Sequence, residues 1–263
     1  MVTVSDTMLS YADAVPATDE ATEKIFLLKE NWRLLFAGSV TPINGVLARI
    51  YAAQRPTSDF DNGAKELEHL KQISREAYQA ERRQQVTDRF LSVYNMTLDE
   101  FRREGLQSFG VQEFAKLNEQ VRDFDLDLTI LVCGFDRQGF PHIFEVGNPG
   151  EIAEHDLLGY AAIGSGADMA RGILTPRSVK RLPWREVMYR LCQAKFASET
   201  ATGVGRITSV LCFSRNGIHL ILPYGHVEKL RGIWDKERSM PIASDILNII
   251  DDGLGISRDF TPT

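Results

Sequence analysis

Two pairs of apolar segments, each joined by a short polar turn, constrain the fold of this chain most. The first pair is the strongly apolar run 126–135 (LDLTILVCGF) and its return over 140–146, with an Asp-Arg-Gln-Gly turn between them. The second pair covers 206–213 and 217–222 and turns at a Ser-Arg-Asn-Gly sequence. Asn-Gly between apolar runs is among the strongest signals for a β-hairpin. We therefore expect antiparallel sheets in the middle and in the C-terminal part of the chain.

Helical patterns lie before and between these hairpins. Residues 64–94 are charged, with apolar side chains at three- and four-residue spacing, and Thr97 followed by Glu100 predicts a capped helix start. Pro42 and Pro183 suit the first turn of a helix, where the missing N–H is not needed. The other expected elements are a loop over 54–63, helices over 111–121, 167–173 and 184–196, and strands over 2–8, 23–28, 33–38 and 160–163.

The order of these elements bears on fold class and domain organisation. Paired strands, then paired helices, then paired strands favour an α+β layered fold over regular β-α alternation. We expect a single domain over 1–263, because the apolar stripe of the long helical segment at about 54–123 needs an external core. A polar tail is expected after about residue 255.

Composition narrows the class of partner. The formal net charge of -6 gives no basic excess to neutralise phosphates, so we expect no nucleic acid partner. A basic stretch followed by an apolar run is missing from the N-terminus, and no apolar run could span a bilayer, so we expect a cytoplasmic protein that uses no membrane.

Cys133, Cys192 and Cys212 lie far apart among apolar residues, which is typical of reduced core cysteines. The His residues have no metal-ligand spacing, and we expect no metal and no cofactor.

Short polar motifs follow one another along most of the chain. They are Asp6, Lys24-Ile25-Phe26, Ala37-Gly38, Ala162-Ile163-Gly164-Ser165-Gly166 and Glu199-Thr200-Ala201-Thr202-Gly203. Together with the hairpin over 126–146, their order resembles the proteasome β-subunit family of N-terminal-nucleophile (Ntn) hydrolases, including its simpler bacterial ATP-dependent relative. The resemblance implies a four-layer α-β-β-α sandwich, with two antiparallel sheets face to face between helical layers.

The resemblance also implies a role for three residues in peptide-bond hydrolysis. In this family an N-terminal Thr attacks, and its own amine or a bound water takes the hydroxyl proton. Lys24 would acidify that hydroxyl through its positive charge, and Asp6 would pair with Lys24 and hold it charged. The backbone N–H of Gly38 would face the developing oxyanion.

Three further residues match the family's outer group, which hydrogen-bonds the terminal amine. They are Ser165, Glu199 and Thr202. The family has Asp and then Ser at the last two of these places. Glu and Thr keep the chemistry of those groups but change their reach.

The nucleophile itself falls outside this sequence. In the family it lies about sixteen positions before the acidic residue, which from Asp6 is about ten positions before residue 1. We therefore expect no peptidase activity from this sequence as it stands, and an open groove beside its first strand. About eleven codons upstream we expect an in-frame start followed by Thr, Ser or Cys. Thr3, Ser5, Thr7 and Ser10 are rejected as nucleophiles, because cleavage before any of them would remove part of that strand.

Three functional interpretations remain open at the level of sequence. The first is a threonine-type peptidase subunit in a homo-oligomeric ring, acting on peptides or proteins, with an ATP-dependent unfoldase as a further partner. The second is a non-catalytic structural subunit with the same fold. The third is a related amidohydrolase acting on small amides. In an assembly we expect the helices over 42–110 to lie in the contacts.

Overall fold

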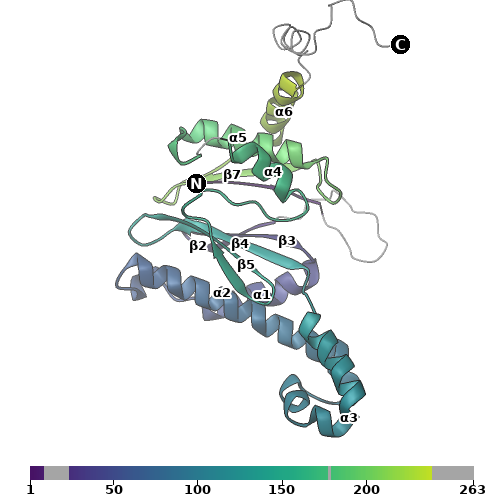
Figure 1. The fold of residues 1–263 in the computed structure, drawn as a ribbon. Coiled ribbons are helices and arrows are strands. Elements are labelled where there is room, and N and C mark those ends of the chain that lie inside the picture. Colours follow the sequence, from purple (N-terminus) through teal and green to yellow (C-terminus); the bar gives the residue numbers. More distant parts are fainter. Residues whose placement is uncertain (9–23, 177–178, 239–263) are drawn as a thin grey trace, which may run out of the picture.

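The computed structural model describes residues 1–8, 24–176 and 179–238, and it contains two antiparallel sheets that face each other (Figure 1). The first sheet has the order β1-β7-β8, built from β1 (Val2–Asp6), β7 (Thr208–Phe213) and β8 (His219–Ile221). The second has the order β2-β3-β4-β5-β6. Its strands are β2 (Ile25–Lys29), β3 (Trp32–Gly38), β4 (Leu128–Phe135), β5 (Pro141–Gly147) and β6 (Glu151–Glu154). The expected α-β-β-α sandwich is confirmed.

The central strand β4 is apolar on both faces because both faces are covered. Ile130 and Val132 pack into the larger core beneath the helices of the second sheet. Leu131 and Cys133 point the other way, into the core between the sheets, where they meet Phe213 of β7. Because successive side chains of a strand point to opposite faces, one continuous apolar run contributes side chains to two separate cores.

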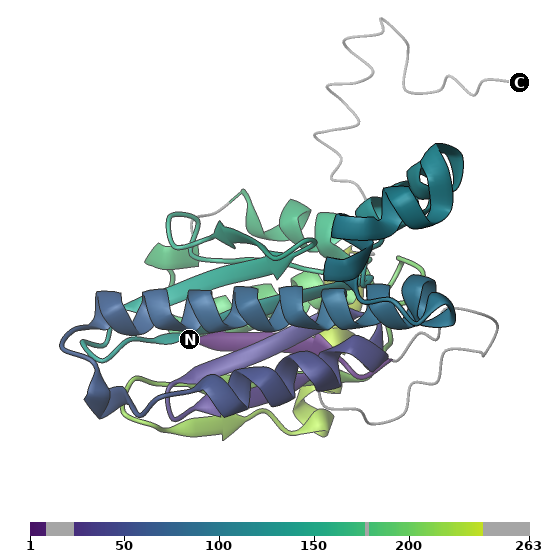
Figure 2. The same ribbon diagram turned by 90° about the horizontal axis from the view of Figure 1, so that it is seen from below.

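Two long helices cover the outer face of the second sheet. They are α1 (Val40–Ala53) and α2 (Gly63–Val86), which lie side by side across the sheet in Figure 2. A short 3-10 turn, η1 (Thr57–Asp59), lies in the loop between them. The first helix begins two residues before the expected start, and Pro42 is buried in its first turn.

Beyond the sandwich, the chain forms a projecting helical arm (Figure 1). α2 leads through a π-helical turn, η2 (Thr87–Leu91), and a 3-10 turn, η3 (Ser92–Tyr94), into α3 (Leu98–Asp123). Thr97 and Glu100 form the expected capping box. Gly110, with a φ of 71°, divides α3 at a sharp kink into two helical parts, which agrees with the two helices expected from the sequence.

Three helices cover the outer face of the first sheet. They are α4 (Ala167–Leu174), α5 (Trp184–Ser198) and α6 (Tyr224–Arg238), with a 3-10 turn, η4 (Val179–Arg181), before α5. One side of α5 packs on α4 through Ala194. Its other side packs on β7 and α6 through Cys192 and Phe196. Apolar contacts on two sides of α5, with α4 on one side and with β7 and α6 on the other, therefore hold this helix in place.

Several expectations were wrong or incomplete. Residues 160–163 form no strand but an extended loop segment along the core between the sheets. The strand that follows β5 is β6, which the sequence did not predict because its residues are mostly polar and exposed, as an edge strand allows. Helix α6 was also missed, and the expected polar tail after about residue 255 lies outside the described residues.

Two further observations concern the described part of the chain. None of its helices is both long and apolar enough to cross a membrane. Within residues 1–8, 24–176 and 179–238, no group of three or more His, Cys, Asp and Glu side chains is placed to hold a metal ion.

Candidate functional site

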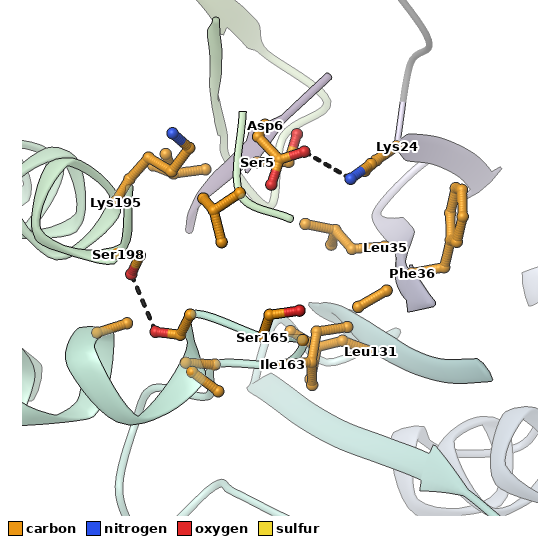
Figure 3. Close-up of a pocket in the computed structure, with 18 of the residues that line it drawn as sticks. Ser5, Asp6, Lys24, Leu35, Phe36, Leu131, Ile163, Ser165, Lys195 and Ser198 are labelled. Atoms are coloured by element: carbon orange, nitrogen blue, oxygen red, sulfur yellow. Dashed lines mark hydrogen bonds and ion pairs between the residues drawn. The ribbon is translucent and has the colours of Figure 1, made fainter. Parts of the chain in front are cut away.

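A cavity of about 300 Å³ lies where the two sheets meet the loop before α4 and the C-terminal half of α5 (Figure 3). Asp6, Lys24, Gly38 and Ser165, four of the six residues singled out in the sequence, line it. In Figure 3 Asp6 and Lys24 lie on one wall and Ser165 lies on the opposite wall. The fold therefore gathers residues that are up to about 160 positions apart into one hollow.

Lys24 and Asp6 form an ion pair in this cavity. Lys24 Nζ lies 2.5 Å from Asp6 Oδ1, and the two side chains are 13% and 16% exposed. Asp6 ends β1, and its Oδ1 also accepts a hydrogen bond from the backbone N–H of Met8 at 2.9 Å. A charged hydrogen bond at such low exposure fixes both groups more firmly than a surface pair would. The pairing expected from the sequence is confirmed.

Gly38 occupies a position that no other residue could fill without movement. Its φ is +98°, and an added Cβ would lie 2.0 Å from the carbonyl oxygen of Asp127. That same carbonyl accepts a 2.6 Å hydrogen bond from the backbone N–H of Ser39. The family resemblance implies that the backbone N–H of Gly38 faces the oxyanion, and the close approach of two backbones is a separate reason for a glycine at this position.

Ser165 is carried by a loop that packs tightly through its glycines. A Cβ on Gly164 would lie 2.9 Å from the side chain of Ala37, and one on Gly166 would lie 2.6 Å from that of Ser198. The Ser198 hydroxyl lies within hydrogen-bond distance of the Gly166 carbonyl, at 3.0 Å, and of the Ala194 carbonyl, at 2.7 Å. The Gly-Ser-Gly sequence thus lets the loop approach both β3 and α5, and this approach places Ser165 at the wall of the cavity.

The other two residues of the expected outer group lie elsewhere. Glu199, directly after α5, is not part of the cavity wall, and its carboxylate is held by Lys195 and Arg231. Thr202 is exposed and does not line the cavity either. The structure therefore brings together Lys24, Asp6, Gly38 and Ser165, and the amine-binding role of Glu199 and Thr202 stays a prediction.

Lys195 lines the cavity and was missed in the sequence analysis. Its side chain is 8% exposed, and its Nζ donates to Glu199 Oε1 at 2.7 Å and to the Gly205 carbonyl at 2.6 Å. Burial lowers the pKa of Lys195, an effect that Glu199 and Asp6 oppose. The signal in the sequence was a Lys and a Glu four residues apart on a helix, with the Lys between apolar residues.

A second cavity, of about 600 Å³, runs along β1 on the side away from β7. Val2 and Val4 line it from β1, and Leu131 and Leu191 line it from β4 and α5. Met1 and Phe213 exchange both backbone hydrogen bonds, so antiparallel alternation points the backbone groups of Val2 and Val4 away from β7. No strand in the described residues pairs with that edge. The expected open groove is present.

Two groups that line this groove, the ammonium of Met1 and the thiol of Cys133, are not suited to act as the nucleophile. The ammonium of Met1 donates to the Phe213 carbonyl at 2.7 Å, and strand geometry places it about 17 Å from Asp6. Cys133 also lines the groove, but complete burial raises the pKa of its thiol to about 12. A reactive thiolate is therefore not available there.

Comparison with known proteins gives structural matches alone. No protein-family model matches the sequence, and no curated protein matches it. The chain is similar to the structure of the Anbu (Gly-1) mutant from Hyphomicrobium sp. strain MC1, with 13% identity and a TM-score of 0.59 over 99% of this chain and 94% of that one. It is also similar to Anbu (ancestral beta-subunit) from Yersinia bercovieri, with 11% identity and a TM-score of 0.57 over 92% and 94%. The chain has a proteasome-like Ntn hydrolase fold.

Proposed function

We propose that this chain is a subunit of a proteasome-like peptidase whose nucleophile is a Thr, Ser or Cys at the start of a segment preceding residue 1. The observation that carries the proposal is the Lys24–Asp6 ion pair, which lies in one cavity with Gly38 and Ser165. A Lys and an Asp at low exposure, beside a glycine backbone and a hydroxyl, are the groups that acyl transfer by an N-terminal nucleophile needs.

Each group has a chemical task in this proposal. The positive charge of Lys24 stabilises the alkoxide form of the attacking hydroxyl, and Asp6 keeps the ammonium in place. The backbone at Gly38 faces the tetrahedral oxyanion. Ser165, on the opposite wall, bonds the terminal amine that acts as the base.

The groove along β1 supplies the route for the nucleophile. A preceding segment that paired antiparallel with the free edge of β1 would begin beside Asp6 and end in a turn at Met1. Two strands of about seven residues and a two-residue turn make about sixteen residues, the separation that the family resemblance requires. Such a hairpin would bring its first residue to the cavity, and its apolar side chains would fill the groove lined by Val4 and Leu131.

The test compares two forms of the protein. One has the sequence described here, and the other is extended by the residues encoded immediately upstream. We expect the extended form to cleave a panel of fluorogenic peptides and the unextended form to be inactive. In the extended form Lys24→Ala should lower kcat/KM by about a thousandfold or more, because the charge that acidifies the nucleophile is removed.

A lysine variant outside the cavity, Lys65→Ala, controls for the general effect of removing a lysine charge from the protein. Lys65 forms an ion pair with Asp61 on the surface of α2, and both side chains are highly exposed. Lys65→Ala should therefore leave peptide cleavage unchanged. A stop codon or a non-nucleophilic residue upstream, or equal rates for Lys24→Ala and Lys65→Ala, would contradict the proposal.

A second candidate is a structural subunit without catalytic activity. It is favoured by the placement of Glu199, whose two carboxylate oxygens are occupied by Lys195 and Arg231, and by the exposure of Thr202. An extended form that folds and assembles but cleaves neither peptides nor small amides would support this candidate.

A further inference from the structure

A buried chain of charges leads from the cavity to the last described helix. Lys195 of α5 lines the cavity near Asp6 and Ser5 (Figure 3). Its Nζ donates to Glu199 Oε1, while Arg231 of α6 holds Glu199 Oε2. Glu199 therefore does not turn towards the cavity. Of the three charged residues Lys195, Glu199 and Arg231, Lys195 is the one that lines the cavity.

Arg231 secures the far end of the chain of charges. It is 4% exposed, and its remaining donors reach the Arg206 carbonyl at 2.7 Å and Glu228 Oε1 at 3.0 Å. Its guanidinium lies over the ring of Phe196, 4.3 Å from the centroid. All three guanidinium nitrogens of Arg231 donate hydrogen bonds, so Arg231 holds Glu199 in a fixed position. Glu199 in turn fixes the position of Lys195.

Asp6 consequently lies between two lysines. Figure 3 shows Lys195 on one side of Asp6 and Lys24 on the other. Lys24 makes the direct ion pair, whereas Lys195 is directed to Glu199 and the Gly205 carbonyl and acts on Asp6 through space. The wall therefore carries two positive groups and one carboxylate at low exposure, where charges are poorly screened.

We propose that Lys195 is a positioning residue of this site, held by Glu199 and Arg231, and that its charge sets the electrostatic environment of the Asp6–Lys24 pair. The kinetic consequence rests on the proposed peptidase function, but the electrostatic consequence does not. Lys195 speeds the chemical step without contacting the substrate's side chains, so its loss affects kcat rather than KM.

Lys71 provides a matched control. It is also 8% exposed and bonds two acceptors, Glu68 Oε1 at 2.9 Å and Glu154 Oε1 at 2.8 Å, but it does not line the cavity. Lys71→Met and Lys195→Met each remove a buried ammonium from its partners. A merely structural role of Lys195 would make the two variants behave alike.

The first experiment measures how fast Lys24 is acetylated, by peptide mass spectrometry, in the chain described here. Loss of the Lys195 ammonium in Lys195→Met leaves Lys24 as the cation that pairs with Asp6, and the tighter ion pair should slow the labelling of Lys24 about threefold. Lys71→Met and the charge-conserving Lys195→Arg should leave it unchanged. An unchanged rate in Lys195→Met, or a Lys195→Arg variant that matches Lys195→Met, overturns the proposal.

The second experiment uses the extended, active form. Lys195→Met should lower kcat about tenfold with little change in KM, and should move the acid limb of the pH–rate profile to higher pH. The sign follows because loss of a positive charge makes the base of the site easier to protonate. The charged groups that face Lys195 are Asp6 of β1, Glu199 after α5 and Arg231 of α6. If the extended form is inactive, the proposed function fails, and the labelling experiment still decides the role of Lys195.

Discussion

At the scale of single residues, the site depends on small side chains as much as on charged ones. Gly164 and Gly166 let the loop before α4 approach both β3 and α5. This close approach places Ser165 at the cavity that Lys24 also lines. The charged residues could be named from the sequence because their spacing matched a family. The backbone contacts of the glycines, and the turn of Glu199 towards Arg231, depend on segments distant in sequence and so could not be predicted.

Substitution of Gly38 should disturb both the stability and the site. Gly38→Ala forces a side chain into a positive φ and against the Asp127 carbonyl, so we expect a loss of about 3 kcal/mol in the free energy of unfolding. Gly110→Ala is the control, because Gly110 also has a positive φ but has open space around it. It should lose only about 1 kcal/mol. Urea unfolding measures both, and equal losses would contradict the backbone contact.

At the scale of secondary structure, most elements could be predicted from apolar period and caps. The hairpin of β4 and β5 and the capping box of Thr97 are local patterns, and both are present. Strand β6 and helix α6 were not predicted, because each is largely polar and is held by tertiary contacts. The attachment of α6 relies on Val227, which joins the core, and on Arg231, which reaches the end of α5.

The ion pair of Arg231 should therefore matter more than other ion pairs of α6. Arg231→Met removes the buried cation that Glu228 and one carboxylate oxygen of Glu199 share, and we expect a loss of about 3 kcal/mol in unfolding free energy. Arg238 pairs with Asp235 at the exposed end of the same helix. Arg238→Met should change the unfolding free energy by less than about 0.5 kcal/mol. Thermal unfolding followed by circular dichroism compares the two, and similar shifts would contradict the attachment of α6 through Arg231.

At the scale of the whole molecule, the sandwich carries a helical arm that the fold alone does not require. In the arm Phe101 packs on Phe109 and Phe114, and this aromatic cluster is continuous with the larger core beneath the helices of the second sheet. It also exposes Val93 and Leu106, at 76% and 53%. Exposed apolar side chains on a projecting element are typical of surfaces that other subunits cover.

We expect the protein to form a homo-oligomer through this arm. Val93→Glu and Leu106→Glu should shift the mass measured by light scattering at micromolar concentration towards the monomer, because buried charges would oppose the contact. Leu157→Glu is the control, since Leu157 is 93% exposed in the loop after β6, far from the arm in the sequence. A wild-type protein that is strictly monomeric would contradict the expectation.

The central claim is that an N-terminal nucleophile preceding residue 1 is activated by Lys24. The most direct measurement is the mass of the extended protein after brief reaction with an activated peptide ester, followed by fragmentation to locate the acyl group. We predict one acyl group on the first residue of the extended chain, formed at least about a hundredfold more slowly in Lys24→Met. Acylation at other residues alone, or an equal rate in Lys24→Met, would contradict the account.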